Sequence, residues 1–442
     1  MIEVSPLMVT GLMFGTMILL MITGLPLAMI LGSVALIYAT LLWGPKAVEL
    51  VYHSALGLMD WTVLVALPLF LFMGIVLERS GIADDLYGMF HKLLGGINGG
   101  LAMGTVLICT LIAAMAGVSG AATVSMGIIA LPAMLKRGYD KRITVGTIQA
   151  GGALGFLIPP SIKMIIFGLL AGVSVGRLYA GGILPGLMLA TMYIIYIGIR
   201  CHFQPYLGPA LPPEERVSWL EKVKSLKAAI LPGCLIFAVL GFIFLGITSI
   251  TEASAIGALG SLICAAVYRK LNWRFLHECL MRSARVIGMV MWICMSAFFF
   301  SKVYTGLGAP KLIKSLLIGT GLGRYGILSM FLLSYFILGM FLDDAAIMFI
   351  TCPIYCPIIE GLGFDPVWFG LLYVISMESA YLTPPFGYNL FYMKGVAPPE
   401  VSIADIYRSV IPFVGLQLLG LAIVVIFPQI ILFLPNLIFG VH

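Results

Sequence analysis

The sequence predicts an all-α polytopic membrane protein, on the evidence of its composition, the lengths of its apolar stretches and an internal repeat. Of its 442 residues, 61% are apolar and 10% are charged, and the mean hydropathy is +1.11. A soluble protein carries about a quarter charged residues. The composition therefore excludes a soluble enzyme and a disordered protein. The net charge of +6 does not indicate a nucleic-acid partner, because Lys and Arg lie in short clusters between apolar runs.

The apolar stretches set the number and order of membrane helices. A membrane helix needs about 20 apolar residues. Stretches of about this length are 6–24, 26–43, 62–78, 176–199, 228–247, 252–268, 284–303 and 405–435. The stretches 97–175 and 326–394 are also apolar, but glycine, proline and small residues divide them, so we expect half-length helices there. The long polar stretch 201–227 is expected to be a linker between two halves.

An internal repeat supports this division. Residues that share an offset of 225 positions are Pro159–Pro160 with Pro384–Pro385, Gly138 with Gly363, and Asp140 with Asp365. One offset without gaps indicates two copies of one unit. We therefore expect a first repeat at 1–200, a cytoplasmic linker at 201–227 and a second repeat at 228–442.

Charge indicates how the two repeats are oriented. The turn at 136–142 carries four basic residues, whereas its counterpart at 360–366 carries two acidic residues and no basic one. By the positive-inside rule, the first turn is cytoplasmic and the second lies outside, so the repeats are inverted. Lys311 and Lys314 do not fit this assignment, and we interpret 307–318 as an interfacial amphipathic segment.

Each repeat is expected to contain a re-entrant helical hairpin followed by a helix broken at its proline pair. The hairpins are expected at about 97–136 and 326–360, and the broken helices at about 141–172 and 366–394. Two consecutive prolines remove two amide donors, and the carbonyls freed before them are hard oxygen ligands suited to an alkali cation. Such backbone is tolerated at membrane depth only where it lines a cavity or binds an ion, which is typical of secondary transporters. A plain proline kink is the alternative.

Polar residues mark the expected hairpin tips. Ser119 lies among small residues in the first hairpin, where a helix-packing patch is the alternative to a tip. Asp343–Asp344 aligns with it in the second hairpin. Adjacent acids in an apolar stretch indicate a functional site, and capping of the half-helix that begins at 344 carries equal weight. Lys163 either faces an anionic solute or snorkels to the interface, and we favour snorkelling.

In their order and spacing, six motifs resemble the large membrane subunit of tripartite ATP-independent periplasmic (TRAP) transporters. The motifs are Ala66–Gly74, Leu157–Ser161, Gly246–Ala253, Gly339–Asp343, Gly363–Gly370 and Leu382–Leu390. The resemblance extends over essentially the whole chain. It implies an elevator-type fold, similar to that of the ion transporter superfamily, in the bacterial inner membrane.

The resemblance also implies a mechanism and partners. A sodium gradient would drive uptake of a carboxylate-containing solute, with Na⁺ as the coupling ion and no covalent cofactor. The partners would be membrane lipid, a small four-helix membrane subunit on a separate chain, and a periplasmic binding protein that delivers the solute. One sodium site would comprise Ser119, Gly155, Ile158 and Pro160, and the other Asp343, Asp344, Ala380, Thr383 and Phe386. Ala380 stands where the family more often has Gly, which leaves a backbone carbonyl ligand in place.

The solute is expected to bind between the tips, where half-helix N-termini favour an anion. Candidate contacts are Ser119, Thr123, Gln149 and Asn389. A stand-alone sodium/anion symporter that needs no binding protein is the alternative function. An intramembrane enzyme would need a nucleophile–base pair or a metal cluster at membrane depth, and the sequence offers neither.

Overall fold

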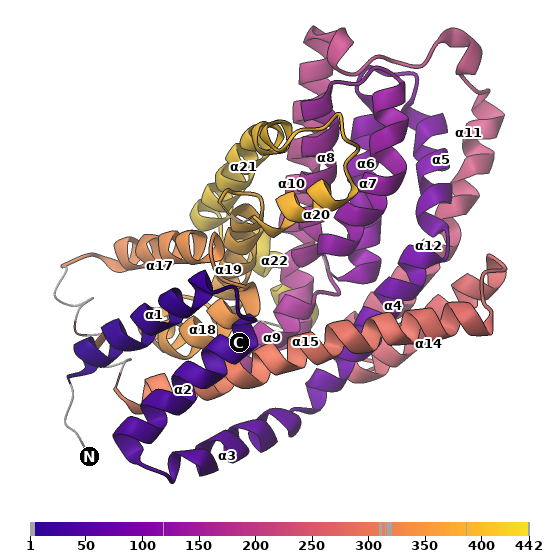
Figure 1. The fold of residues 1–442 in the computed structure, drawn as a ribbon. Coiled ribbons are helices and arrows are strands. Elements are labelled where there is room, and N and C mark those ends of the chain that lie inside the picture. Colours follow the sequence, from indigo (N-terminus) through magenta and orange to yellow (C-terminus); the bar gives the residue numbers. More distant parts are fainter. Residues whose placement is uncertain are drawn as a thin grey trace.

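The structure is a computed structural model that describes residues 5–117, 119–308, 312–313, 315, 321–385 and 387–440. Within these ranges it consists of helices and their connections, without a strand (Figure 1). Among the described helices, eight are long and apolar enough to cross a membrane. They span Thr62–Arg79, Ser119–Lys136, Val175–Phe203, Trp219–Phe244, Ile250–Val267, Trp273–Gly306, Asp344–Gly361 and Ile403–Ile426. The predicted all-α polytopic class is therefore confirmed.

The first half of the chain forms helices α1 to α10. Their bounds are α1 Pro6–Ile22, α2 Leu27–Trp43, α3 Ala47–Met59, α4 Ala66–Arg79, α5 Ile82–Leu94, α6 Gly100–Ala116, α7 Ser119–Lys136, α8 Lys141–Ala153, α9 Ile162–Ala171 and α10 Val175–Phe203. The second half follows the polar stretch 201–227, and its first helix, α11, lies within that stretch. Its helices are α11 Trp219–Ser225, α12 Ile230–Ile236, α13 Phe242–Phe244, α14 Ile250–Val267, α15 Trp273–Gly306, α17 Arg324–Gly339, α18 Asp344–Gly361, α19 Pro366–Tyr381, α20 Tyr388–Val396, α21 Ile403–Ile426 and α22 Gln429–Phe439.

Local signals explain where the helices at the centre of the molecule begin. Asp140 caps α8, because its side chain accepts hydrogen bonds from the amides of Arg142 and Ile143. Asp365, which lies 225 positions later, caps α19 by accepting from the amides of Val367 and Trp368. An Asp cap satisfies amides that would otherwise lack partners at a helix start. The two recurring aspartates therefore have the same local role.

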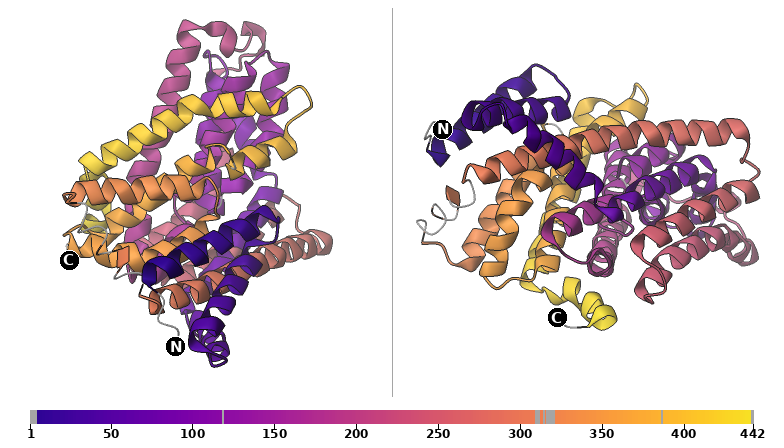
Figure 2. Two further views of the ribbon diagram at one scale, coloured as in Figure 1. Left: turned by 60° about the vertical axis from the view of Figure 1, so that its left-hand side comes forward. Right: turned by 90° about the horizontal axis from the view of Figure 1, so that it is seen from below.

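The helices pack in two groups. α14 lies along α4, and α15 lies along α2 and contacts α3, so these helices form one extended group across the lower part of Figure 1. α6, α7, α8, α10, α19 and α21 form the second group, in which α8 packs against α6, α7 and α21. The N-terminal helices and α22 lie on different sides of the molecule (Figure 2).

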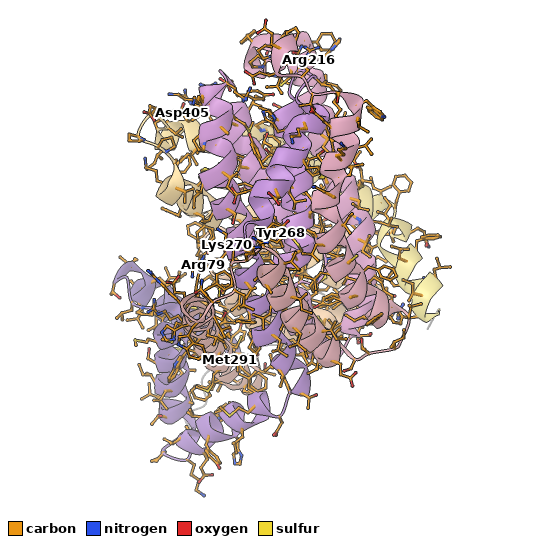
Figure 3. All side chains as sticks on the ribbon, turned by 90° about the vertical axis from the view of Figure 1, so that its right-hand side faces the viewer. Arg79, Arg216, Tyr268, Lys270, Met291 and Asp405 are labelled. Carbon is orange, nitrogen blue, oxygen red and sulfur yellow. The ribbon has the colours of Figure 1, made fainter. Side chains whose placement is uncertain are left out.

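Three basic residues labelled in Figure 3, Arg79, Arg216 and Lys270, lie at a helix end or in a connection between helices. Arg216, in the connection after α10, lies at one end of the molecule and donates from Nε to the carbonyl of Leu211 at 3.0 Å. Arg79, at the end of α4, forms an ion pair of 2.8 Å with Glu278 of α15. This pair joins two helices of the first group at their polar ends.

Three expectations need comment. The half-length helices expected within 97–175 and 326–394 are wrong for α7 and α18, which have 18 residues each and are long enough to cross a membrane. The single span expected at 405–435 is wrong, because α21 ends at Ile426 and α22 begins at Gln429. Pro428 lies between them, and proline lacks the amide donor that a continuous helix requires. Lys311 and Lys314 lie outside the described residues, as does most of the segment after Gly308 that we interpreted as interfacial.

Candidate functional site

The first tip, residues 117 and 119, is where α6 meets α7. Gly117 ends α6 with φ of +64°, a left-handed conformation that favours glycine. A Cβ at this position would lie 2.3 Å from the carbonyl oxygen of Pro160, well inside van der Waals contact. Gly117 therefore allows the first tip to touch the backbone of the segment that carries the first proline pair.

That segment, the first proline loop (154–161), separates α8 from α9 and is buried throughout. The Ser161 hydroxyl donates to the carbonyl of Phe156 at 2.6 Å. The carbonyls of Ile158 and Pro160 accept no hydrogen bond from any residue within the described ranges. Buried carbonyls normally find a partner. The loop thus presents backbone oxygens at the place where the first tip contacts it.

The first predicted sodium set lies around this contact. Ser119 begins α7, two positions after the glycine that touches Pro160. Gly155 and Ile158 lie on the same loop, and α6 and α7 both pack against the 154–156 turn. The structure brings the four residues to one region, and their role as sodium ligands stays a prediction.

The four candidate solute contacts lie together and are fully buried. The Ser119 hydroxyl donates to Oδ1 of Asn389 at 2.8 Å, and Nδ2 of Asn389 donates to the carbonyl of Gln149 at 3.4 Å. These contacts join α7 to α20, which lies across it, and to α8 (Figure 1). Thr123 lies one turn further along α7 and packs against Gly152 of α8. A Cβ at Gly152 would lie 2.0 Å from the hydroxyl oxygen of Thr123.

The sequence analysis missed one member of this chain of contacts. Nε2 of Gln149 donates to the hydroxyl of Ser409 on α21 at 3.3 Å. Ser409 carries no local signal, because a serine inside an apolar helix most often bonds to its own backbone, and this one also donates to the carbonyl of Ile406. The hydroxyl of Thr123 and Oε1 of Gln149 have no hydrogen-bond partner among the described residues. The cluster therefore retains free polar atoms.

The second tip, residues 340–344, joins α17 to α18. Oδ1 of Asp343 accepts a hydrogen bond from the amide of Ala345 at 3.0 Å, so Asp343 caps α18. Asp344 has different partners. The Tyr381 hydroxyl donates to its carboxylate, and the Tyr373 hydroxyl donates to its backbone carbonyl at 2.7 Å. Both tyrosines belong to α19, which therefore holds the second tip in place.

Lys163 completes the contacts of Asp344. Its Nζ lies 2.9 Å from Oδ2 of Asp344, and the lysine side chain is only 7% exposed. The ammonium also lies over two aromatic rings, 2.9 Å from the centroid of Phe156 and 4.1 Å from that of Tyr381. The expectation that Lys163 snorkels to the interface is therefore wrong, because a carboxylate of the other half of the chain supplies a partner inside the protein.

The second proline loop, residues 382–385 and 387, differs from the first. Pro384 and Pro385 are exposed, whereas their counterparts are buried. The Thr383 hydroxyl donates to the carbonyl of Ser379 at 2.7 Å, and the Thr383 amide donates to the carbonyl of Ala380 at 3.0 Å. Ala380 also touches the end of α17. A Cβ at Gly339 would lie 2.6 Å from the Cβ of Ala380. Phe386, the remaining member of the second predicted sodium set, lies outside the described residues.

One further acidic side chain is buried near these elements. Glu378 of α19 is fully buried, and neither carboxylate oxygen has a hydrogen-bond partner within the described part of the chain. Among the described residues, His, Cys, Asp and Glu do not gather into a group of three or more that could hold a metal ion through side chains alone.

Within the described ranges, the chain is helical, and its eight helices of spanning length define the class of polytopic membrane proteins. The fold is similar to that in the crystal structure of the YdaH transporter of Alcanivorax borkumensis, with a TM-score of 0.64 and 16% identity, over 91% of this chain and 98% of that one. Residues 14–430 match the family described as the tripartite ATP-independent periplasmic transporter, DctM component. The chain belongs to this family.

Relatives of nearly equal length support the assignment. The C4-dicarboxylate TRAP transporter large permease protein DctM of Vibrio cholerae is 32% identical, over 98% of this chain and 99% of its own. The ectoine TRAP transporter large permease protein TeaC of Halomonas elongata is 30% identical, over 97% of this chain and 100% of its own. The chain is thus a multi-pass inner-membrane permease subunit of a transporter, not an enzyme.

Proposed function

We propose that this chain is the large permease of a sodium-driven TRAP transporter that takes up a carboxylate-containing solute. A small four-helix membrane subunit and a periplasmic binding protein would be its partners. Relatives whose names give C4-dicarboxylates and ectoine as solutes support this class of cargo. The observation that carries the proposal is a pair of contacts with the interrupted helices. Gly117 of the first tip meets Pro160, and Gly339, at the end of α17 just before the second tip, meets Ala380.

Inverted repeats and an elevator-type movement are part of the proposal. The helix starts support the repeat, because α7 and α18 begin at Ser119 and Asp344, and α8 and α19 begin at Lys141 and Pro366. Both pairs have the 225-residue offset of the sequence repeat. In this account, α6–α9 and α17–α20 form the moving part with two re-entrant hairpins. The extended group of α2, α3, α4, α14 and α15 forms part of the scaffold.

Sodium would bind first at the contact between the first tip and the first proline loop. The carbonyls of Ile158 and Pro160, which accept no hydrogen bond from a described residue, would supply hard oxygen ligands, and the Ser119 hydroxyl and the Gly155 carbonyl would complete the shell. The ion would fix the first tip against the loop and thereby position Ser119 against Asn389. Sodium occupancy would then raise the affinity for the solute, and the solute would raise the affinity for sodium by the same factor.

The solute would bind beside the chain Ser119–Asn389–Gln149. Free polar atoms of Thr123 and Gln149 face a buried region there, where an unpaired polar group is costly until a ligand or water satisfies it. α7 and α20 both begin in this cluster, and the positive ends of their dipoles favour a carboxylate.

Reconstituted uptake tests the function. The chain, its small subunit and its binding protein are reconstituted in liposomes, and uptake of the carboxylate that the binding protein retains is measured. We expect uptake with an inward sodium gradient and none with an equal potassium gradient. Uptake that persists after the sodium gradient is collapsed would contradict sodium coupling. Uptake without the binding protein would favour the stand-alone symporter instead.

A further inference from the structure

Each tip contacts the half-helix that follows the proline pair of the other repeat, and the two contacts differ in charge. At the first tip, Ser119 donates to Asn389 near the start of α20. At the second tip, Asp344 pairs with Lys163 near the start of α9. Ser119 and Asp344 are 225 positions apart, and Lys163 and Asn389 are 226 apart. A neutral hydrogen bond at one tip therefore corresponds to an ion pair at the other.

One carboxylate oxygen and two aromatic rings form a cation cage around Lys163. A carboxylate oxygen of Asp344 lies at 2.9 Å, and the rings of Phe156 and Tyr381 cover the ammonium. Aromatic faces attract a cation electrostatically, and they do so most strongly away from water. The Tyr381 hydroxyl donates to the same carboxylate that binds the lysine. The cage is drawn from the first proline loop, the second tip and the end of α19, so the cation joins all three.

The other acid of the second tip is already engaged. Asp343 accepts from the amide of Ala345 and lies at the N-terminus of α18, where the helix dipole favours a negative charge. In the second predicted sodium set, the carbonyl of Ala380 accepts from the Thr383 amide, and the Thr383 hydroxyl donates to the carbonyl of Ser379. At the second tip, the cationic group next to the Asp344 carboxylate is thus the Lys163 ammonium.

We propose that the Lys163 ammonium is a tethered cation that takes the place of a mobile sodium ion at Asp344. This inference rests on the proposed sodium coupling, which it narrows to the single mobile ion of the first tip. The lysine ammonium is a compact charge with three donors on a flexible four-carbon side chain. Because it is covalently attached, it cannot dissociate as a sodium ion can. The second tip is then held closed at any sodium concentration, whereas the first tip responds to sodium.

The test compares thermal midpoints in NaCl and KCl at equal ionic strength, for the purified full chain with its small subunit. In wild type, we expect the midpoint to rise with the logarithm of the sodium concentration at the slope of one bound ion. In Lys163→Gln, the Asp344 carboxylate is left without its cation. Sodium then occupies the vacated position, so the slope is about twice that of wild type.

Two further variants separate the charge from the fold. Lys163→Gln/Asp344→Asn removes both charges, so its sodium-dependent rise returns to the wild-type value. Lys302→Gln is the matched control, because Lys302 also lies over a ring, 4.6 Å from the centroid of Phe298, without an ion pair among the described residues. Its sodium response should equal that of wild type.

The outcomes are distinct. An unchanged sodium response in Lys163→Gln, or a wild-type slope that corresponds to two bound ions, would overturn the tethered cation. The wild-type titration needs no variant, so it tests the inference even where Lys163→Gln does not fold. A wild type that ignores sodium alongside a Lys163→Gln variant that responds to it would refute the proposed first-tip site and support the tethered cation.

Discussion

Replacing Gly117 by alanine tests the contact between the first tip and the first proline loop. Alanine in the left-handed conformation of Gly117 costs about 1–2 kcal/mol. The added Cβ also meets the carbonyl oxygen of Pro160 at 2.3 Å, and relief of such overpacking costs about 1–3 kcal/mol more. Because the obstacle is backbone, the loop itself must move. The expected loss in the free energy of unfolding is therefore about 2–5 kcal/mol.

Gly172→Ala is the matched control. Gly172 ends α9 with φ of +67°, close to the value at Gly117, but a Cβ there meets nothing within 4 Å. Gly172→Ala should therefore lose only the free energy of placing alanine in the left-handed conformation. Thermal unfolding followed with a thiol-reactive dye suits both variants, since the eight cysteines are free and all except Cys234 are buried. We expect Gly117→Ala to unfold at a lower temperature than Gly172→Ala and to lose its response to sodium. Equal midpoints and equal sodium responses would refute the reasoning.

Two other predictions concern packing and capping. Gly152→Ala should destabilise the protein by about 1–3 kcal/mol, because its Cβ would lie 2.0 Å from the Thr123 hydroxyl. Gly198→Ala is the control and should not destabilise the protein, because the added Cβ would meet only Sδ of Met103, at 3.5 Å. Equal thermal midpoints for the two variants would contradict the α7–α8 packing. Ser249→Ala should cost about 1 kcal/mol, because Ser249 and Glu252 form a capping box at the start of α14. That variant should retain wild-type sodium affinity in a thermal titration, and a weakened affinity would count against a purely local role.

The parts of the fold that sequence could predict are those set by local chemistry. Apolar length predicted six of the eight described helices that are long enough to cross a membrane, but not α7 and α18, where half-length helices were expected. Asp140 and Asp365 mark helix starts by the same capping geometry. Glycine and proline mark the tip at Gly117 and the loop at Pro160, because each restricts which backbone conformations are possible there. The break at Pro428 had the same kind of signal, and the apolar residues on either side of it obscured the signal.

Contacts between distant parts of the chain were not predictable in the same way. Lys163 and Asp344 lie in different halves, and neither has a neighbour in sequence that identifies its partner. Snorkelling is the usual fate of an isolated lysine near an apolar helix, and only the folded arrangement shows the carboxylate that keeps this one inside. The contact of Gln149 with Ser409 depends likewise on α8 and α21 lying side by side. For the candidate site, sequence therefore indicated Ser119, Thr123, Gln149 and Asn389 but not Ser409, and the fold determined how they pair.

Direct binding of ²²Na⁺ to the purified chain with its small subunit tests the central claim, a sodium site where the first tip meets the first proline loop. The account predicts saturable binding that excess KCl does not displace. The binding should be lost when Ser119, buried at the start of α7, is replaced by a bulky residue. Equal displacement by potassium, or unchanged sodium binding in the Ser119 variant, would contradict it.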